Sequence, residues 1–266
     1  MPANDYTIYL VNQSSGTQIF SCFLQRPAEL AGRSSVFDVT NLRLGVRSFS
    51  EGSDYFVIPQ QLAVAVGASN QPVGANAQIV SNRTLNAAPG DQFSAEYVTV
   101  PPPMGPALTR SGTGAAPGKI SISANPFDQA SNEAQGWFAN MSFGIQTGSG
   151  FMGVTWSPSP NQTNDLTPVW GFLVTAQAYS KNSLVSFAVD ANTSAQLTAP
   201  KDFLNGAATV TYTATGGWQV TPGKPQPGPR LVRASTGSLA DAHRSLTQAH
   251  SALIALAVVL GPDRSR

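Results

Sequence analysis

Charged side chains are scarce in this sequence. Its 266 residues include 15 basic and 14 acidic side chains, which makes 11% charged against about 25% in an ordinary soluble domain. The formal net charge of +1 leaves no overall field that would attract nucleic acid, so we expect no nucleic-acid partner. Hydrophobic residues make up 41%, which is enough for a core and excludes wholesale disorder.

Cysteine and histidine are almost absent as well. Cys22 is the only cysteine, which excludes an intramolecular disulfide, and its apolar surroundings predict a strand residue rather than a reactive thiol. Both histidines, His243 and His250, lie near the C-terminus. This excludes a Ser-His-Asp triad, a Cys-His pair and a histidine metal site from residues 1–222. The sequence therefore predicts no catalytic residue, no metal site and no cofactor.

Long apolar runs are also missing. The longest, Ala252 to Leu260, has nine residues, whereas a transmembrane helix needs about 20. The first residues, Met1 to Tyr6, contain neither the basic nor the apolar region of a secretory signal. We therefore expect no transmembrane segment and a cytoplasmic location, with leaderless export as the alternative.

Residues 5–221 show the pattern of a β protein. Tyr6–Val11 alternates, a turn cluster follows, and Gln18–Leu24 continues at once, which predicts a hairpin. Further apolar runs follow at regular spacing between Gly, Pro, Asn and Ser clusters. They are Asp54–Val66 (with a break at Pro59), Gln78–Val80, Gln92–Val100, Lys119–Ser123, Met141–Gln146, Met152–Trp156, Trp170–Ala176, Leu184–Val189, Thr209–Thr215 and Trp218–Val220. Short strands at this spacing predict an all-β domain, an antiparallel β-sandwich with Greek-key connections.

Two stretches of the sequence are rich in glycine. Gly148–Gly153 matches the G-x-G-x-x-G pattern of dinucleotide-binding loops, but it continues into an apolar strand rather than a helix. We therefore expect a hairpin turn there. Pro101–Gly118 is rich in proline and glycine and predicts a long surface loop.

The composition changes at Pro222. Residues 222–237 form a Pro/Gly-rich linker, and residues 238–261 have the period of an amphipathic helix. Four leucines recur every seven residues on one face of this helix, namely Leu239, Leu246, Leu253 and Leu260. Such a stripe packs on the domain, pairs with a second copy or lies on a membrane surface, and the thinly charged polar face favours the first two. These leucines are therefore candidate oligomerisation residues.

Tryptophans are the candidate ligand-binding residues. Trp137, Trp156 and Trp170 lie near the ends of predicted strands, where exposed rings stack on sugars. The alternative is that these rings fill the core of the sandwich.

Several segments resemble those of proteins similar to the rhizosphere-expressed protein RhiA. The first are Tyr6–Ser15, a Tyr-rich strand with an Asn-Gln-Ser-Ser turn, and Phe23–Pro27. In the second half they are the Gly/Met-rich Gly136–Gly153, then Leu166–Gly171, and the closing Gly217–Val220. The resemblance covers about residues 6–220 and implies a compact all-β protein without an assigned biochemical activity. It carries over no catalytic residue.

These observations leave three functions open. The first is a non-enzymatic binding or accessory protein, as in the RhiA-like family, with a carbohydrate or a protein as partner. The second is a carbohydrate-binding module or lectin that uses surface tryptophans. The third is a membrane-acting β protein.

Overall fold

The computed structural model describes residues 5–98, 105–186 and 193–225. Strands dominate these residues, and the only helix among them is the short α1 (Gln129–Ala134). The prediction of an all-β protein is confirmed. Most of the predicted linker and the whole predicted tail helix, with Leu239, Leu246, Leu253 and Leu260, lie outside the described residues.

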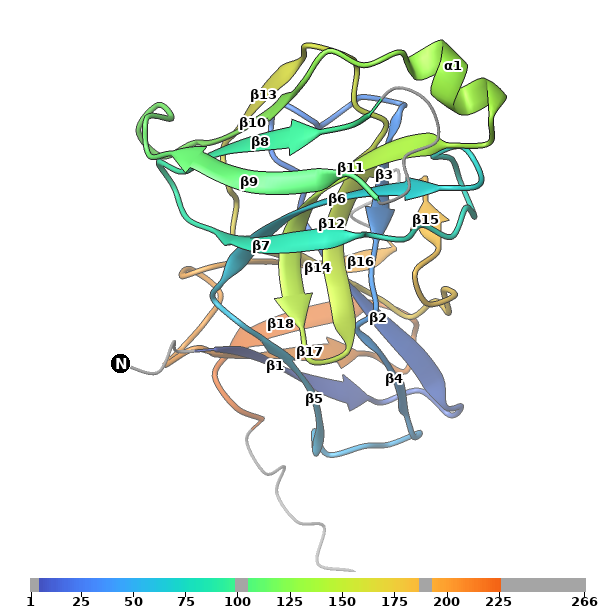
Figure 1. The fold of residues 1–266 in the computed structure, drawn as a ribbon. Coiled ribbons are helices and arrows are strands. Elements are labelled where there is room, and N and C mark those ends of the chain that lie inside the picture. Colours follow the sequence, from blue (N-terminus) through green and yellow to red (C-terminus); the bar gives the residue numbers. More distant parts are fainter. Residues whose placement is uncertain (1–4, 99–104, 187–192, 226–266) are drawn as a thin grey trace, which may run out of the picture. The chain divides into compact units, whose positions relative to one another are not determined.

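The strands form four sheets, each named here after a central strand (Figure 1). The β1 sheet has the order β18 (Trp218–Pro222), β17 (Ala207–Tyr212), β1 (Tyr6–Asn12) and β5 (Asp54–Ile58). The β2 sheet has the order β16 (Ser194–Thr198), β14 (Gly171–Thr175), β2 (Gln18–Leu24) and β4 (Arg43–Val46). The β11 sheet has the order β15 (Leu184–Val185), β3 (Val36–Val39), β12 (Gly150–Trp156), β11 (Phe138–Thr147), β6 (Leu62–Ser69) and β7 (Arg83–Ala87). The β8 sheet has the order β13 (Thr163–Leu166), β10 (Ile120–Ala124), β8 (Gln92–Glu96) and β9 (Ala107–Gly112).

Most neighbouring strands are antiparallel, but β1 with β17 and β8 with β10 are parallel pairs. Figure 1 shows the β8 sheet and α1 at one end and the β1 and β2 sheets at the other. The hairpin of β11 and β12 reaches from one end to the other. One hydrophobic cluster contains buried side chains from all four sheets, so the described domain has one main core.

The hairpin predicted for the first two strands is wrong. β1 pairs with β17 and β5, whereas β2 pairs with β14 and β4. The turn between them crosses from one sheet to the other because the Asn12 amide Nδ2 donates to the carbonyl oxygens of Gly16 (2.8 Å) and Val46 (3.1 Å). The two sheets then face each other, and Phe20 of β2 meets Trp218 of β18 with ring centroids 5.8 Å apart.

The other local predictions have mixed outcomes. The break at Pro59 separates β5 from β6, and the glycine-rich Gly148–Gly153 lies at the turn of the β11–β12 hairpin, so both predictions are confirmed. Gln78–Val80 is not a strand, since only Gln78 forms an isolated bridge. The predicted loop Pro101–Gly118 contains β9, which pairs with β8.

The central strands β6, β11 and β12 are buried on both faces. Successive residues of a strand point to opposite faces. One face carries large apolar side chains such as Val64, Phe143 and Val154, each 1% exposed. The other face carries small residues, and Gly144 lies opposite Gly153 in the β11–β12 register. A Cβ added to either glycine would overlap a main-chain carbonyl oxygen of the other strand, so this close approach requires glycine at both positions.

Ion pairs connect segments that are distant in the sequence. They are Arg26–Asp38 (2.6 Å), Arg110–Asp91 (3.0 Å) and Lys119–Glu29 (3.4 Å). Burial raises the pKa of the Asp38 carboxyl, and the Arg26 guanidinium offsets part of this rise. The chain has few charges, and each of these pairs connects a loop or an edge strand to the rest of the domain.

The carboxylate of Glu29 has partners besides its ion pair. Its oxygens accept from the Thr167 hydroxyl (2.6 Å) and the Thr167 N–H (3.1 Å), and Lys119 lies 3.4 Å away. Burial raises the pKa of this carboxyl, but these hydrogen bonds outweigh burial and lower it to about 2. Glu29 therefore stabilises the folded state in its charged form.

The glycine pair gives the first prediction. Gly144→Ala will lower the free energy of unfolding by roughly 1–3 kcal/mol, because the new methyl group forces β11 and β12 apart. Urea unfolding measures the change. Gly148→Ala is the control, since a Cβ at that turn meets nothing within 4 Å. Equal stability of the two variants would contradict the close approach.

Glu29 gives a prediction about pH. A carboxyl whose pKa is lower in the folded state adds stability above its unfolded pKa and loses it as pH falls through the folded pKa. The difference in unfolding free energy between the wild type and Glu29→Gln will therefore be full above pH 5 and shrink as pH falls toward about 2. Urea titrations across this range measure it, with the exposed Glu51→Gln as a control for charge removal. A difference that does not change with pH would contradict the Glu29 assignment.

Candidate functional site

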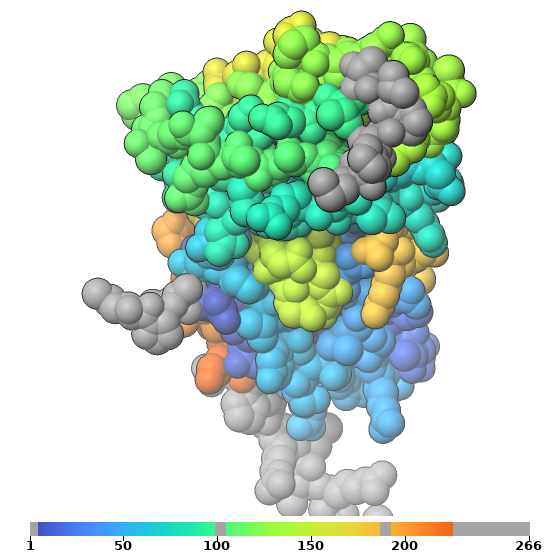
Figure 2. Space-filling model, viewed as in Figure 1, coloured from blue at the N-terminus to red at the C-terminus, as the bar shows by residue number. Residues whose placement is uncertain are grey.

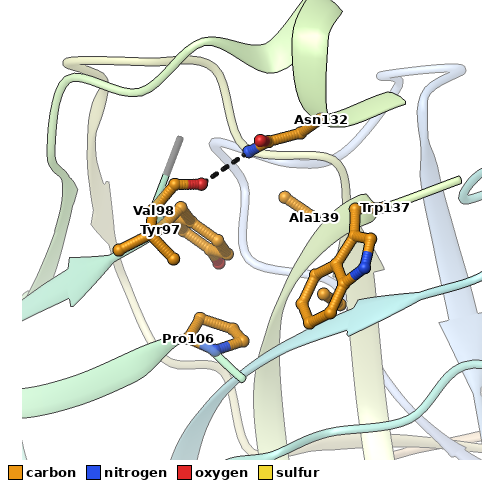
Figure 3. Close-up of a pocket in the computed structure, with 7 residues that line it drawn as sticks. Tyr97, Val98, Pro106, Asn132, Trp137 and Ala139 are labelled. Atoms are coloured by element: carbon orange, nitrogen blue, oxygen red, sulfur yellow. Dashed lines mark hydrogen bonds between the residues drawn. The ribbon is translucent and has the colours of Figure 1, made fainter. Parts of the chain in front are cut away.

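A hollow lies beside α1, where the β8 and β11 sheets meet. It is lined by Ala68 on β6, Tyr97 and Val98 after β8, Pro106 before β9, Asn132 on α1, Trp137 just before β11 and Ala139 at the start of β11. Figure 3 shows Tyr97 and Val98 on one side of the hollow and Trp137 on the other, with Asn132 and Pro106 between them at opposite edges. Segments from four parts of the chain build the site, so it exists only in the folded domain.

Tyr97 forms a fixed wall of the hollow. Its side chain is 3% exposed, and its hydroxyl donates to the Asn140 main-chain carbonyl at 2.8 Å. The Asn125 amide holds its main chain, since Oδ1 accepts from the Tyr97 N–H (2.7 Å) and Nδ2 donates to the Tyr97 carbonyl (2.9 Å). Burial raises the pKa of the Tyr97 hydroxyl, which therefore stays a protonated donor.

Trp137 is positioned by the end of α1. Asp128 caps the start of this helix, because its carboxylate accepts a main-chain N–H of the first turn at 3.0 Å. Gly136 follows the helix with φ +75°, a conformation that favours glycine. The Asn132 carbonyl then accepts the Trp137 N–H (2.9 Å), while the Asn132 Nδ2 donates to the Val98 carbonyl (2.8 Å). One residue thus holds both Trp137 and the opposite wall.

The lining provides an indole ring, a carboxamide and apolar surface. None of its seven side chains carries a charge, and the Tyr97 hydroxyl already donates to Asn140. Trp137 is half-buried, so part of its ring remains at the surface. Such a set of groups suits non-covalent contact with a neutral ligand that presents an apolar face to the indole.

The structure does not bring the three predicted ligand residues together. Trp156 lies on β12 and is 4% exposed, so its ring belongs to the core. Trp170 is half-buried and packs against Tyr6, with ring centroids 5.8 Å apart. Only Trp137 lines the hollow.

The sequence does not mark the partners of Trp137 as site residues. Tyr97 falls inside the predicted strand Gln92–Val100, where nothing marks it as a pocket wall. Asn132 lies on α1, a helix too short to show an apolar period. The available signal is Asp128 ahead of α1 and Gly136 after it, a cap and a stop that together indicate a short helix.

No group of three or more His, Cys, Asp or Glu that could hold a metal ion occurs in the part of the chain that the structure describes. No helix within the described ranges is long and apolar enough to cross a membrane. Comparisons with protein-family models, with curated proteins and with solved structures gave no match.

Proposed function

We propose that this chain is a binding or accessory protein and that the hollow at Trp137 is its ligand site. The observation that carries this proposal is the half-buried indole of Trp137, held by Asn132 in a hollow without charged side chains. Rigid aromatic rings in preformed hollows provide contact area at a low cost in conformational entropy.

A sugar ring is the neutral ligand that these groups favour. Because the hollow measures only about 10 Å³, the ring would rest at its mouth, against the exposed part of the Trp137 indole. Its C–H face stacks on an indole, and its hydroxyl groups hydrogen-bond to amides and main-chain carbonyls. Beside the hollow, the Asn132 Nδ2 donates to the Val98 carbonyl (2.8 Å), so a polar amide group lies next to the indole. The carbohydrate-binding function is thus the specific form of the proposal that these residues favour.

Several more specific predictions from the sequence remain proposals. They are the resemblance to the RhiA-like family, the Greek-key arrangement of the sandwich, the C-terminal amphipathic helix, the membrane-acting alternative and the cytoplasmic location.

A glycan array of the full-length chain tests the proposal, followed by fluorescence titration of the strongest glycan. Trp137→Ala will weaken binding at least about tenfold and remove the ligand-dependent fluorescence change, because stacking on one ring is worth roughly 1.4 kcal/mol or more. Trp170→Phe is the matched control, since it removes an equally half-buried tryptophan outside the hollow. Glycan binding that survives Trp137→Ala, or no binding to any glycan, would contradict the carbohydrate proposal.

A further inference from the structure

Exposed apolar side chains gather around one strand. Six large apolar side chains are exposed among the described residues, and three of them are Phe49 (70%), Tyr55 (51%) and Val57 (42%). Tyr55 and Val57 lie on β5, and Phe49 lies in the turn that leads into it. The other three (Val80, Val98 and Leu204) lie outside the strands. β5 is therefore the only described strand with large apolar side chains exposed to solvent.

β5 is also an edge strand. It pairs with β1 on one side, and no other described strand pairs with it, although β11 approaches it. It lies at the molecular surface in the lower part of Figure 2, within the light-blue segment. Proteins protect exposed edges with lysine, proline or bulges. β5 has none of these within Asp54–Ile58, and Pro59 comes only after its last residue.

The sequence of β5 is complementary to itself. In an antiparallel pair of two β5 strands centred on Phe56, Tyr55 of each copy faces Val57 of the other, on the exposed face of the sheet. Aromatic and β-branched residues form favourable cross-strand pairs. The only charge, Asp54, then lies opposite Ile58, and the two Asp54 side chains are roughly 13 Å apart along the strands.

We propose that β5 is a docking edge for a second copy of this chain, so that two β1 sheets join through antiparallel β5 strands about a two-fold axis. We assign a second copy as the partner of this edge because one antiparallel register pairs all five residues of β5. The same register places Tyr55 opposite Val57 and keeps the two Asp54 side chains apart. A five-residue edge makes a small interface, so the dimer belongs to the weak class that buries less than about 1,200 Å².

The turn before β5 supports this assignment. Phe49 has φ +53°, a backbone conformation that bulky residues rarely adopt, and its side chain is the most exposed of the six. Asn12 fixes the turn, since its N–H donates to the Ser50 hydroxyl (2.9 Å) and its carbonyl accepts from the Ser50 N–H (3.0 Å). In the antiparallel dimer this turn comes beside the end of the other copy's β5, where Phe49 adds apolar contact.

Sedimentation of the full-length chain from about 5 to about 500 µM tests the proposal in the range of weak interfaces. The wild type will rise from the mass of the 27.8 kDa monomer toward twice that mass. Val57→Lys will weaken association at least tenfold, because lysine on an edge blocks strand pairing. Gln219→Lys places the same exposed charge on β18, the other edge of the β1 sheet, and will associate like the wild type.

Cross-linking tests the register. An oxidised mixture of Tyr55→Cys and Val57→Cys chains will form disulfide-linked dimers, whereas either variant alone will form several-fold fewer, because position 55 faces position 57. Cys22 is fully buried and will not contribute. Equal cross-linking of each variant alone would overturn the register.

Two outcomes would overturn the proposal as a whole. One is a monomer at every concentration. The other is a dimer that Val57→Lys leaves intact and Leu246→Asp abolishes, which would assign association to the predicted tail helix. Neither outcome bears on ligand binding at Trp137, so this proposal and the proposed function fail separately.

Discussion

Strands β11 and β12 approach each other closely at Gly144 and Gly153, and the main core packs against the hairpin that they form. Glycine at both positions removes the side chains at this point of the ladder, so the two main chains come close together there. The other face of the hairpin carries large apolar side chains of the main core, among them Phe143 and Val154. Because the hairpin of β11 and β12 reaches both ends of the domain, its packing couples the β8 sheet to the β1 and β2 sheets.

The candidate site and the proposed docking edge are both connected to the β11–β12 hairpin. Trp137 lies just before β11 and Ala139 near its start, and the Tyr97 hydroxyl donates to the Asn140 carbonyl of the same strand. The hollow is therefore anchored to the most buried part of the sheet. At the other end, β5 continues through Pro59 into β6, which pairs with β11. Polar amides such as Asn12 and Asn125 hydrogen-bond to the main chain of segments distant in the sequence.

The sequence predicted local features and the hairpin turn at Gly148–Gly153, but it did not predict which strands pair when they are distant in the chain. Alternation in Tyr6–Val11 and the break at Pro59 predicted strands correctly, because these signals depend on neighbouring residues only. The prediction of a β1–β2 hairpin was wrong, because the Asn12 amide hydrogen-bonds to the carbonyl of Val46, which is distant in the sequence. The turn after β1 therefore leads into another sheet. Trp137 was recognised as a candidate, but its partners Tyr97 and Asn132 come together only through tertiary contacts.

Native-state hydrogen exchange tests the central role of the β11–β12 contact most directly. If the rest of the domain depends on this contact, amides of β6, β11 and β12 will exchange only through global unfolding, with the full unfolding free energy. Amides of the edge strands β13 and β18 will exchange faster through local opening. Exchange in β11 and β12 as fast as in these edges would contradict the account, because the proposed centre would then open before its periphery.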